Sequence, residues 1–140
     1  MTDNNQTNEL GEASPYGLPN TLGMHIVGHG EQWVHLALEV EEKHMAPNGF
    51  LHAGTVVSLA DSACGFACAR SLPPEASGFT TVELKSNFMG TAREGVIEAK
   101  AQAVHLGRST HVWDAIVTHR DTGKTIAMFR CTQMILRKPG

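Results

Sequence analysis

The longest apolar stretch of the chain covers residues 55–69 and contains no proline. If this stretch is helical, its apolar side chains point in nearly every direction, which is the pattern of a helix buried on all sides. It is too short to span a bilayer, which needs about 20 apolar residues in a row. We therefore predict a long helix buried at the centre of the protein. Its apolar residues are Val56, Val57, Leu59, Ala60, Ala63, Cys64, Phe66, Ala67 and Cys68.

The remaining apolar pattern is that of strands. Apolar and more polar residues alternate over residues 33–40, which predicts a strand with one buried face. Residues 71–78 contain two prolines and are expected to form an exposed connection after the helix. Four strand-like runs then follow, separated by glycine-containing turns of the kind found in an antiparallel meander. These runs are residues 79–89, 95–106, 109–119 and 124–136.

One buried helix and a long antiparallel sheet predict an α+β fold, with the helix against the inner face of the sheet. A sheet wrapped around one helix leaves open edge strands, which favours a dimer with a continuous sheet. The length of 140 residues fits one domain, which we expect over residues 23–137. Residues 1–22 are expected to form a flexible tail and lead-in, and residues 138–140 a short C-terminal tail.

Composition excludes several function classes. The net charge is −3 and the basic residues are scattered, so we expect no nucleic-acid partner. No basic segment precedes an apolar run at the N-terminus, so we expect neither a secretory signal nor membrane association. Three cysteines fit a reducing, cytoplasmic location better than a disulfide framework. The eight histidines lack metal-ligand spacing, and we expect no metal or other cofactor.

Asp61 is the one carboxylate in the apolar helix. Burying an ionised carboxylate without partners costs several kcal/mol, so Asp61 must be paired, protonated or used chemically. Just upstream, His52, Ala53 and Gly54 would form the start of the helix. The first N–H groups of a helix have no internal partner, and they suit a carbonyl oxygen that becomes negative. A structural partnership of Asp61 with an arginine, a serine or a backbone turn is the alternative.

The pattern Asn48-x-x-x-His52-x-Gly54, followed by Asp61 and a strand meander, resembles the hotdog-fold acyl-CoA thioesterases. The resemblance is to the PaaI-like (phenylacetate-catabolism) branch, which is related to the 4-hydroxybenzoyl-CoA thioesterases that have Glu in place of Asp61. Residues 81–88 and 105–108 also resemble this branch, and the similarity covers about residues 23–136. It implies a hotdog fold, in which an antiparallel sheet of about five to six strands wraps one long central helix.

The resemblance also implies a reaction, the hydrolysis of acyl-CoA thioesters of aryl or medium-chain acids to free acid and coenzyme A. In this reaction Asp61 would act as nucleophile or general base, and the Ala53 N–H would polarise the thioester carbonyl. Asn48, His52 and Gly54 would shape the loop, with His52 either bracing it or contacting substrate. The family usually has His-Gly-Gly where this chain has Ala53, a change that is harmless if the backbone φ angle there is negative.

Further contacts with substrate or coenzyme A are predicted along the chain. Four residues after the acid, where the related branch can offer a hydroxyl, this chain has Gly65, and Ser62 is the nearest substitute. Arg108 is the first candidate for the coenzyme A phosphates, by family likeness. We also predict substrate or coenzyme A contacts from Ser109 and Asn87.

The spacing between the two central site residues predicts a dimer. Asp61 lies eight residues beyond Ala53, so the two are roughly 12 Å apart along one helix. This distance is too long for both to meet one thioester carbon. We therefore expect Ala53 of one protomer to work with Asp61 of its partner across a two-fold axis, in a homodimer or a dimer-of-dimers homotetramer.

Two other functions share the expected fold. A non-catalytic acyl-CoA-binding domain that acts as a sensor would not need Asp61, and it would usually carry a DNA-binding segment, for which the residues before Gly23 leave no room. A dehydratase or hydratase acting on acyl thioesters would combine a catalytic histidine with an acid, and His52 keeps this alternative open.

Overall fold

The computed structural model describes residues 13–139. The predicted tail over residues 1–12 lies outside the described residues, as does Gly140. Within the described residues, six antiparallel strands form one sheet in the order β1-β2-β4-β5-β6-β3. The strands are β1 His25–Gly30, β2 Trp33–Glu39, β3 Ala76–Phe88, β4 Val96–Leu106, β5 Thr110–His119 and β6 Thr125–Arg137.

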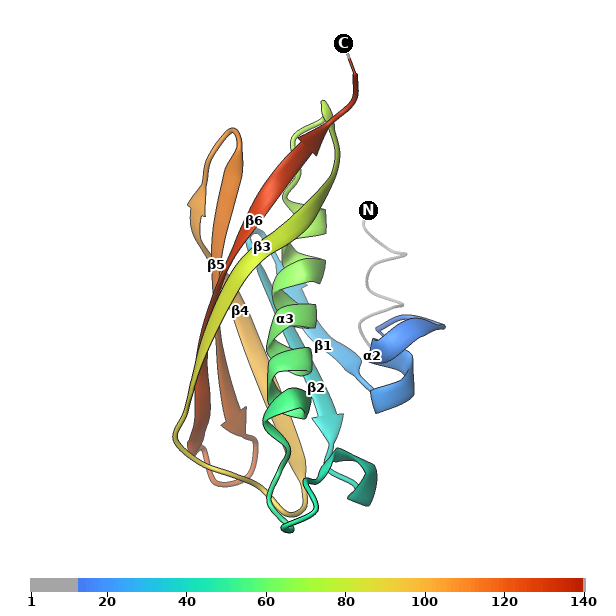
Figure 1. Cartoon of the computed structure of the whole chain (residues 1–140), viewed down its shortest axis with the longest axis vertical. Helices are drawn as coiled ribbons and strands as arrows, with labels where there is room; N and C mark the ends of the chain where they lie inside the picture. Colours follow the sequence, from blue (N-terminus) through green and yellow to red (C-terminus); the bar gives the residue numbers. More distant parts are fainter. Residues whose placement is uncertain (1–12, 140) are drawn as a thin grey trace.

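The long helix α3 spans Ala53–Arg70 and lies against one face of this sheet (Figure 1). The predicted α+β architecture is therefore confirmed, as are the strands predicted after the helix, to within a few residues. The lead-in contains a short helix, α2 Gly17–Leu22, and a 3-10 turn, η1 Glu42–His44, precedes the loop that leads to α3. The expected connection over residues 71–78 is shorter than predicted, because β3 already begins at Ala76.

Small side chains let α3 approach the sheet closely. Ile97, Ala99 and Ala101 lie on the inner face of β4 and are buried, as the alternation along that strand predicts. A helix packed on such small residues buries its own side chains deeply. The buried residues of α3 are Thr55, Val56, Leu59, Ala60, Ala63, Cys64, Ala67 and Cys68.

The other side of α3 is not buried within the protomer, which corrects the prediction of a helix buried all round. Val57, Asp61, Ser62, Gly65 and Phe66 are only half-buried. Apolar side chains on every side of a helix indicate that all its sides are buried. They do not tell whether the same chain or a second copy buries them. This half-buried side shares a cavity with Phe79 and Thr81 of β3. Strand β3 lies at an edge of the sheet, and its only strand neighbour among the described residues is β6.

Strand β3 is a long open edge. It is 13 residues long, and most of its side chains are exposed in the protomer, including Val82, Leu84 and Phe88. An open edge presents unpaired backbone N–H and C=O groups that pair readily with another strand.

None of the helices in the described part of the chain is both long and apolar enough to cross a membrane.

Candidate active site

The start of α3 is held by a histidine cap. His52 precedes the first helical residue, and its Nδ1 accepts a hydrogen bond from the Gly54 N–H at 2.7 Å. The His52 N–H donates to the His44 carbonyl at 3.0 Å, which ties the cap to the preceding turn. A Cβ atom on Gly54 would lie 2.9 Å from the His52 Nδ1, so only glycine leaves room for the ring in this position.

Ala53 is the first residue of α3, and its N–H has no hydrogen-bond partner among the described residues. The residue is exposed, so this donor is open to a ligand. Gln32 is the one non-glycine residue with positive φ in the described chain. Ala53 therefore has the negative φ that its side chain prefers, and the departure from His-Gly-Gly introduces no backbone strain.

The loop before the cap is shaped by Asn48. Its Oδ1 accepts a hydrogen bond from the Phe50 N–H at 3.1 Å, and Gly49 between them has a φ of 87°. This is a side-chain turn of the kind that asparagine favours. The Leu51 N–H donates to the Thr91 hydroxyl at 3.0 Å, which fixes the loop to the segment after β3. Asn48, His52 and Ala53 are thus brought together at one end of α3.

Asp61 lies on the half-buried side of α3, two turns beyond Ala53. Its Oδ1 atom is buried and has no hydrogen-bond partner within residues 13–139. The ion pairs of this part of the chain involve other carboxylates, those of Glu98, Asp114 and Glu75. Burial raises the pKa of Asp61 above its ordinary value. The carboxylate therefore lacks the structural partner that the alternative interpretation requires.

A cavity of about 360 Å³ opens beside Asp61. Its wall combines the carboxylate with two hydroxyls, two aromatic rings and two small residues, so it suits an apolar group with a few polar contacts. The lining residues are Asp61, Ser62, Gly65, Phe66, Ala69, Phe79 and Thr81. Ser62 and Gly65, both predicted from the sequence, are brought together with Asp61. Phe79 and Thr81 were not predicted as site residues, although alternation along β3 puts both on its inner face.

The two halves of the predicted site do not meet in one chain. Ala53 and Asp61 lie on the same continuous helix, eight residues apart, which corresponds to roughly 12 Å along its axis. Asn48, His52 and Ala53 are absent from the lining of the cavity beside Asp61. One described chain therefore offers an acid in a cavity and, separately, a free N–H at a helix N-terminus.

Arg108 and Ser109 lie in the turn between β4 and β5, at the end of the molecule where α3 terminates (Figure 1). The Ser109 carbonyl accepts the Ile135 N–H at 2.9 Å, and the Arg108 carbonyl accepts from the Arg137 guanidinium. Both contacts use backbone carbonyls. The Arg108 side chain is exposed, and Glu75 is near enough to interact with it electrostatically.

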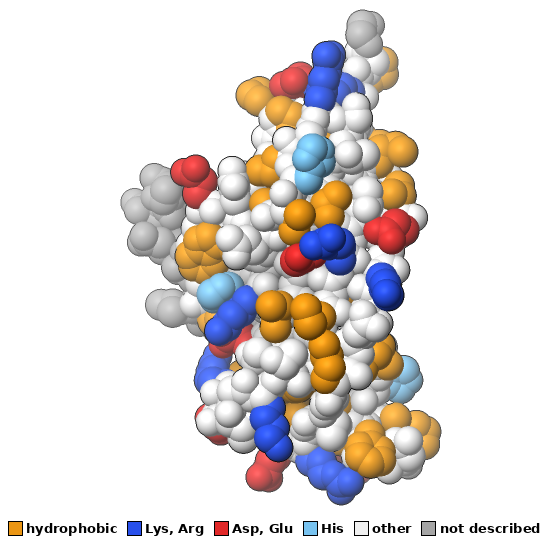
Figure 2. Space-filling view, turned by 90° about the vertical axis from the view of Figure 1, so that its left-hand side faces the viewer, with side chains coloured by type: hydrophobic (Ala, Val, Ile, Leu, Met, Phe, Trp, Pro, Cys, Tyr) orange, Lys and Arg blue, Asp and Glu red, His pale blue; other side chains and the backbone are white. Residues whose placement is uncertain are grey.

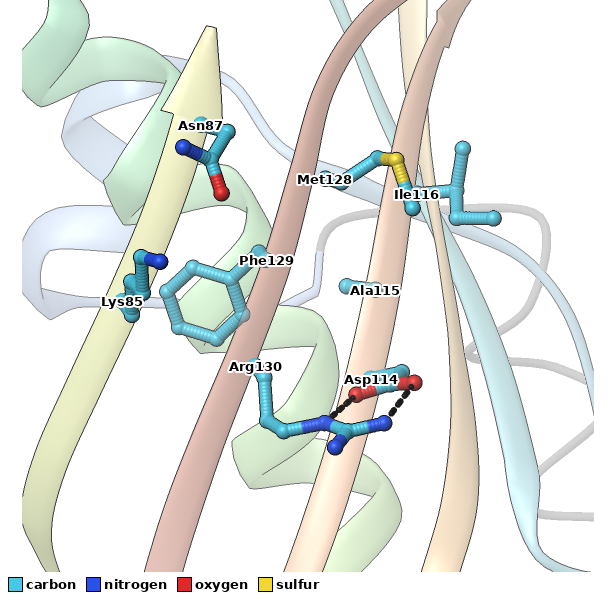
Figure 3. Close-up of a pocket in the computed structure, with 8 residues that line it drawn as sticks. All are labelled: Lys85, Asn87, Asp114, Ala115, Ile116, Met128, Phe129 and Arg130. Atoms are coloured by element: carbon cyan, nitrogen blue, oxygen red, sulfur yellow. Dashed lines mark hydrogen bonds and ion pairs between the residues drawn. The ribbon is translucent and has the colours of Figure 1, made fainter.

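Asn87 lies apart from the other predicted site residues. It lines a hollow of about 210 Å³ on the sheet face turned away from α3, together with Lys85, Ile116 and Met128 (Figure 3). Within this hollow Arg130 binds Asp114 through two hydrogen bonds, of 2.5 and 2.9 Å. Hydrophobic, basic and acidic side chains are interspersed over this outer face (Figure 2). Its acid is already paired, so the hollow lacks a free carboxylate for hydrolysis.

Thiol and metal chemistry find little support in the described residues. Cys64, Cys68 and Cys131 are buried free thiols. Burial raises the pKa of Cys68 to about 12, which keeps it protonated and unreactive at neutral pH. Within residues 13–139, no three histidine, cysteine or acidic side chains are grouped in a way that could hold a metal ion.

Comparison with known proteins gives a consistent result. The sequence profile of the Thioesterase superfamily matches residues 48–126, which is more than half of the chain. A 1,4-dihydroxy-2-naphthoyl-CoA hydrolase of Listeria monocytogenes is 35% identical, over 87% of this chain and 98% of that protein. The acyl-coenzyme A thioesterase PaaI of Escherichia coli is 31% identical, over 78% of this chain and 75% of that protein.

The solved structures agree with the sequence comparison. The crystal structure of a mutant thioesterase from Pseudomonas aeruginosa superimposes with a TM-score of 0.80 at 29% identity, over 85% of each chain. The chain therefore belongs to the thioesterase superfamily, and it is a hotdog-fold thioester hydrolase related to the PaaI-like acyl-CoA thioesterases.

Proposed function

We propose that this protein hydrolyses acyl-CoA thioesters of aryl or medium-chain acids, with Asp61 as the nucleophile or general base. The observation that supports this most directly is the buried, unpartnered Oδ1 of Asp61 beside a cavity of about 360 Å³. A carboxylate without a structural partner is expensive to bury, and a reaction explains why it is retained. The Phe66 and Phe79 side chains in the same wall suit an aryl group.

The two chemical roles follow from the environments of the two groups. The free Ala53 N–H stands at the positive end of the α3 dipole, where it would stabilise the negative charge that develops on the thioester oxygen. The raised pKa makes Asp61 a stronger base than an exposed aspartate, provided that it is ionised. Asp61 would either attack the thioester carbon, forming an anhydride that water then hydrolyses, or remove a proton from an attacking water. In both routes the carbon–sulfur bond breaks, and coenzyme A leaves as the thiolate and then takes up a proton.

The proposed site is complete only in a dimer. A second copy that adds its own β3 to the open edge would continue the sheet across a two-fold axis. It would also cover the half-buried side of α3, because that side shares a cavity with residues of β3. In this homodimer the Ala53 N–H of one protomer works with Asp61 of the other, and two such dimers would form the homotetramer.

We propose further that coenzyme A is held at its phosphates by Arg108, with Ser109 beside it. Exposure of the Arg108 side chain supports this role. Asn87 would contact coenzyme A only if the ligand extends to the outer face of the sheet. The hydratase alternative has less support, because the His52 Nδ1 is occupied as the helix cap.

The test is a panel of acyl-CoA thioesters with detection of the free thiol, applied to the wild type and to the Asp61→Asn and Asp61→Ala variants. Loss of a general base lowers kcat about 10²–10⁴-fold, and we expect a loss in this range for both variants. Asp121→Asn, which changes an exposed acid in the turn between β5 and β6, serves as the control and should retain wild-type rates. Hydrolysis at wild-type rates in both Asp61 variants would remove Asp61 from the mechanism.

A further inference from the structure

Gln133 is a polar side chain buried in the core of the protein. It lies on the inner face of β6 and is 0% exposed. A buried amide is costly unless its polar atoms form hydrogen bonds. The Gln133 Oε1 accepts a hydrogen bond from the Thr81 hydroxyl at 2.7 Å, and its Nε2 donates to the Cys131 sulfur at 3.4 Å. Because sulfur is a weak acceptor, Thr81 is the principal partner of this amide.

The pairing of the strands fixes this contact. Thr81 lies directly opposite Gln133 in the antiparallel pairing of β3 with β6, so the two side chains meet across the strands on the same face. Thr81 is also part of the wall of the cavity that contains Asp61. The Gln133 amide does not line the cavity itself, but it orients the Thr81 hydroxyl, which does.

The direction of this hydrogen bond decides what Thr81 offers to a ligand. A threonine hydroxyl has one proton and two lone pairs. Its proton is directed at the Gln133 Oε1, so the hydroxyl presents acceptor capacity to the cavity. Most of the surrounding wall is apolar, formed by Gly65, Phe66, Ala69 and Phe79.

We propose that Thr81 is a specificity-determining residue that selects acyl groups carrying a hydrogen-bond donor, a hydroxyl or an amino group, and that Gln133 is the positioning residue that fixes Thr81 as an acceptor. The inference rests on the proposed function, because it concerns the acyl pocket beside Asp61. An acyl group without a donor would cover the Thr81 oxygen and deprive it of water. A donor at the same position replaces the lost hydrogen bond.

The experiment compares matched substrates. Benzoyl-CoA is used with a hydroxyl, an amino group or a fluorine at the same ring position, for each of the three positions, because fluorine is similar in size and donates no hydrogen bond. We expect the wild type to prefer the hydroxyl and amino compounds over the fluoro compound by about tenfold in kcat/KM at one position, the effect of one neutral hydrogen bond. Because this contact exists in both ground and transition states, the preference should appear in KM and not in kcat.

The variants separate the roles of the two residues. Thr81→Val keeps the shape of the side chain and should reduce the preference to about one, whereas Thr81→Ser should retain it. Gln133→Met frees the Thr81 proton, so it should reduce the preference through KM while kcat is unchanged. Thr80→Val is the matched control, because Thr80 is the neighbouring exposed residue on the other face of β3, and it should leave the preference intact. The double variant Thr81→Val/Gln133→Leu replaces both partners by apolar side chains, which such pairs tolerate well, and it should lack the preference too.

Outcomes of three kinds would contradict the inference. A wild type without the donor preference, or a Thr81→Val protein that folds and retains it, would overturn the role of Thr81 while leaving acyl-CoA hydrolysis intact. A fall in kcat for every substrate in Gln133→Met, without a change in preference, would show that Gln133 is merely structural. Hydrolysis of no acyl-CoA thioester, aryl or medium-chain, or full hydrolysis by Asp61→Asn, would instead overturn the proposed function and the inference together.

Discussion

The Nδ1 atom of His52 lies 2.7 Å from the backbone nitrogen of Gly54 and caps α3. This contact explains the glycine, since a Cβ atom there would lie 2.9 Å from the same Nδ1. It also uses the N–H next to that of Ala53, so the cap leaves Ala53 as the free donor at the start of the helix. The first prediction follows from this arrangement.

Gly54→Ala should destabilise the protein by about 1 kcal/mol, the typical cost of a lost N-cap. The His52 ring has to move away from the new methyl group, and the cap bond breaks as it does so. His52→Ala should cost a similar amount, and the double variant should cost no more than either single variant. Chemical denaturation of the four proteins measures these free energies of unfolding, and additive costs would show that the two residues are not coupled.

Ala53→Pro should abolish most activity without unfolding the helix. Proline is favoured at the first position of a helix, and the preceding residue must be extended, as His52 is with φ −67° and ψ 133°. The substitution removes the N–H that would stabilise the thioester oxygen, so kcat should fall about 10²–10³-fold. Thermal melting and steady-state kinetics on the same samples check both parts, with Ala53→Gly as the control that retains the N–H. A fully active proline variant would eliminate this donor from the mechanism.

Mixing two inactive variants should restore activity if the site is shared between protomers. A heterodimer of Ala53→Pro and Asp61→Asn contains one site with both native groups. Random exchange of equal amounts should therefore recover about a quarter of wild-type activity in a symmetric dimer. The measurement is the rate before and after subunit exchange, with the oligomeric state followed by light scattering. No recovery after demonstrated exchange would mean that both groups act within one chain.

The pH dependence should report the environment of Asp61. Activity needs the ionised carboxylate, so kcat/KM should fall as the pH drops through the raised pKa, at a higher pH than for an ordinary aspartate. Stability changes in the opposite sense. Between the unfolded and folded pKa values the folded state binds more protons, so the free energy of unfolding decreases as pH rises through this window.

Asp61→Asn removes this dependence on pH. The variant should be more stable than the wild type above the window, and the advantage should disappear below the ordinary aspartate pKa of about 3.9. Thermal melting from acidic to neutral pH measures the difference. A stability advantage of Asp61→Asn that grows toward low pH would contradict the raised pKa of Asp61.

Gly65→Ala should leave the protein as stable or more stable, and it should weaken substrate binding. The new Cβ would lie 3.7 Å from the Phe79 ring, an ordinary contact, and replacing a helical glycine by alanine typically gains about 0.4–1 kcal/mol. The methyl group also occupies part of the cavity wall, so KM for aryl substrates should rise. Melting temperature and KM are measured together, and an unchanged KM for bulky acyl groups would show that they do not reach Gly65.

The elements of the fold were predictable from the sequence because the apolar pattern of the helix and the alternating pattern of the strands are easy to tell apart. An apolar run without proline gives α3, and strict alternation gives the strands with Ala99 and Ala101 on their inner face. Asp61 was recognisable as a site candidate because a charge within an apolar helix demands an explanation. The half-buried side of α3 was not predictable, because an apolar side chain has the same pattern whether its own chain or a second copy covers it.

Residues that depend on strand register were also beyond the sequence. Thr81 meets Gln133 only because β3 pairs with β6 in one register, and the two lie 52 positions apart along the chain. Register also decides that Asn87 lies beside Met128 on the outer face of the sheet. Simple alternation along β3 would put Asn87 on the same face as Thr81. A register shift between Thr81 and Glu83 reverses the alternation, and the sequence alone does not reveal it.

The free donor at residue 53 belongs to the main chain, and this has a consequence for how such enzymes diverge. Any amino acid except proline supplies the same N–H when it begins a helix, so the identity of the side chain there is free to drift. The glycine of the usual His-Gly-Gly pattern and the alanine of this chain would then be equivalent solutions. A search for essential residues by side-chain truncation would pass over this position altogether.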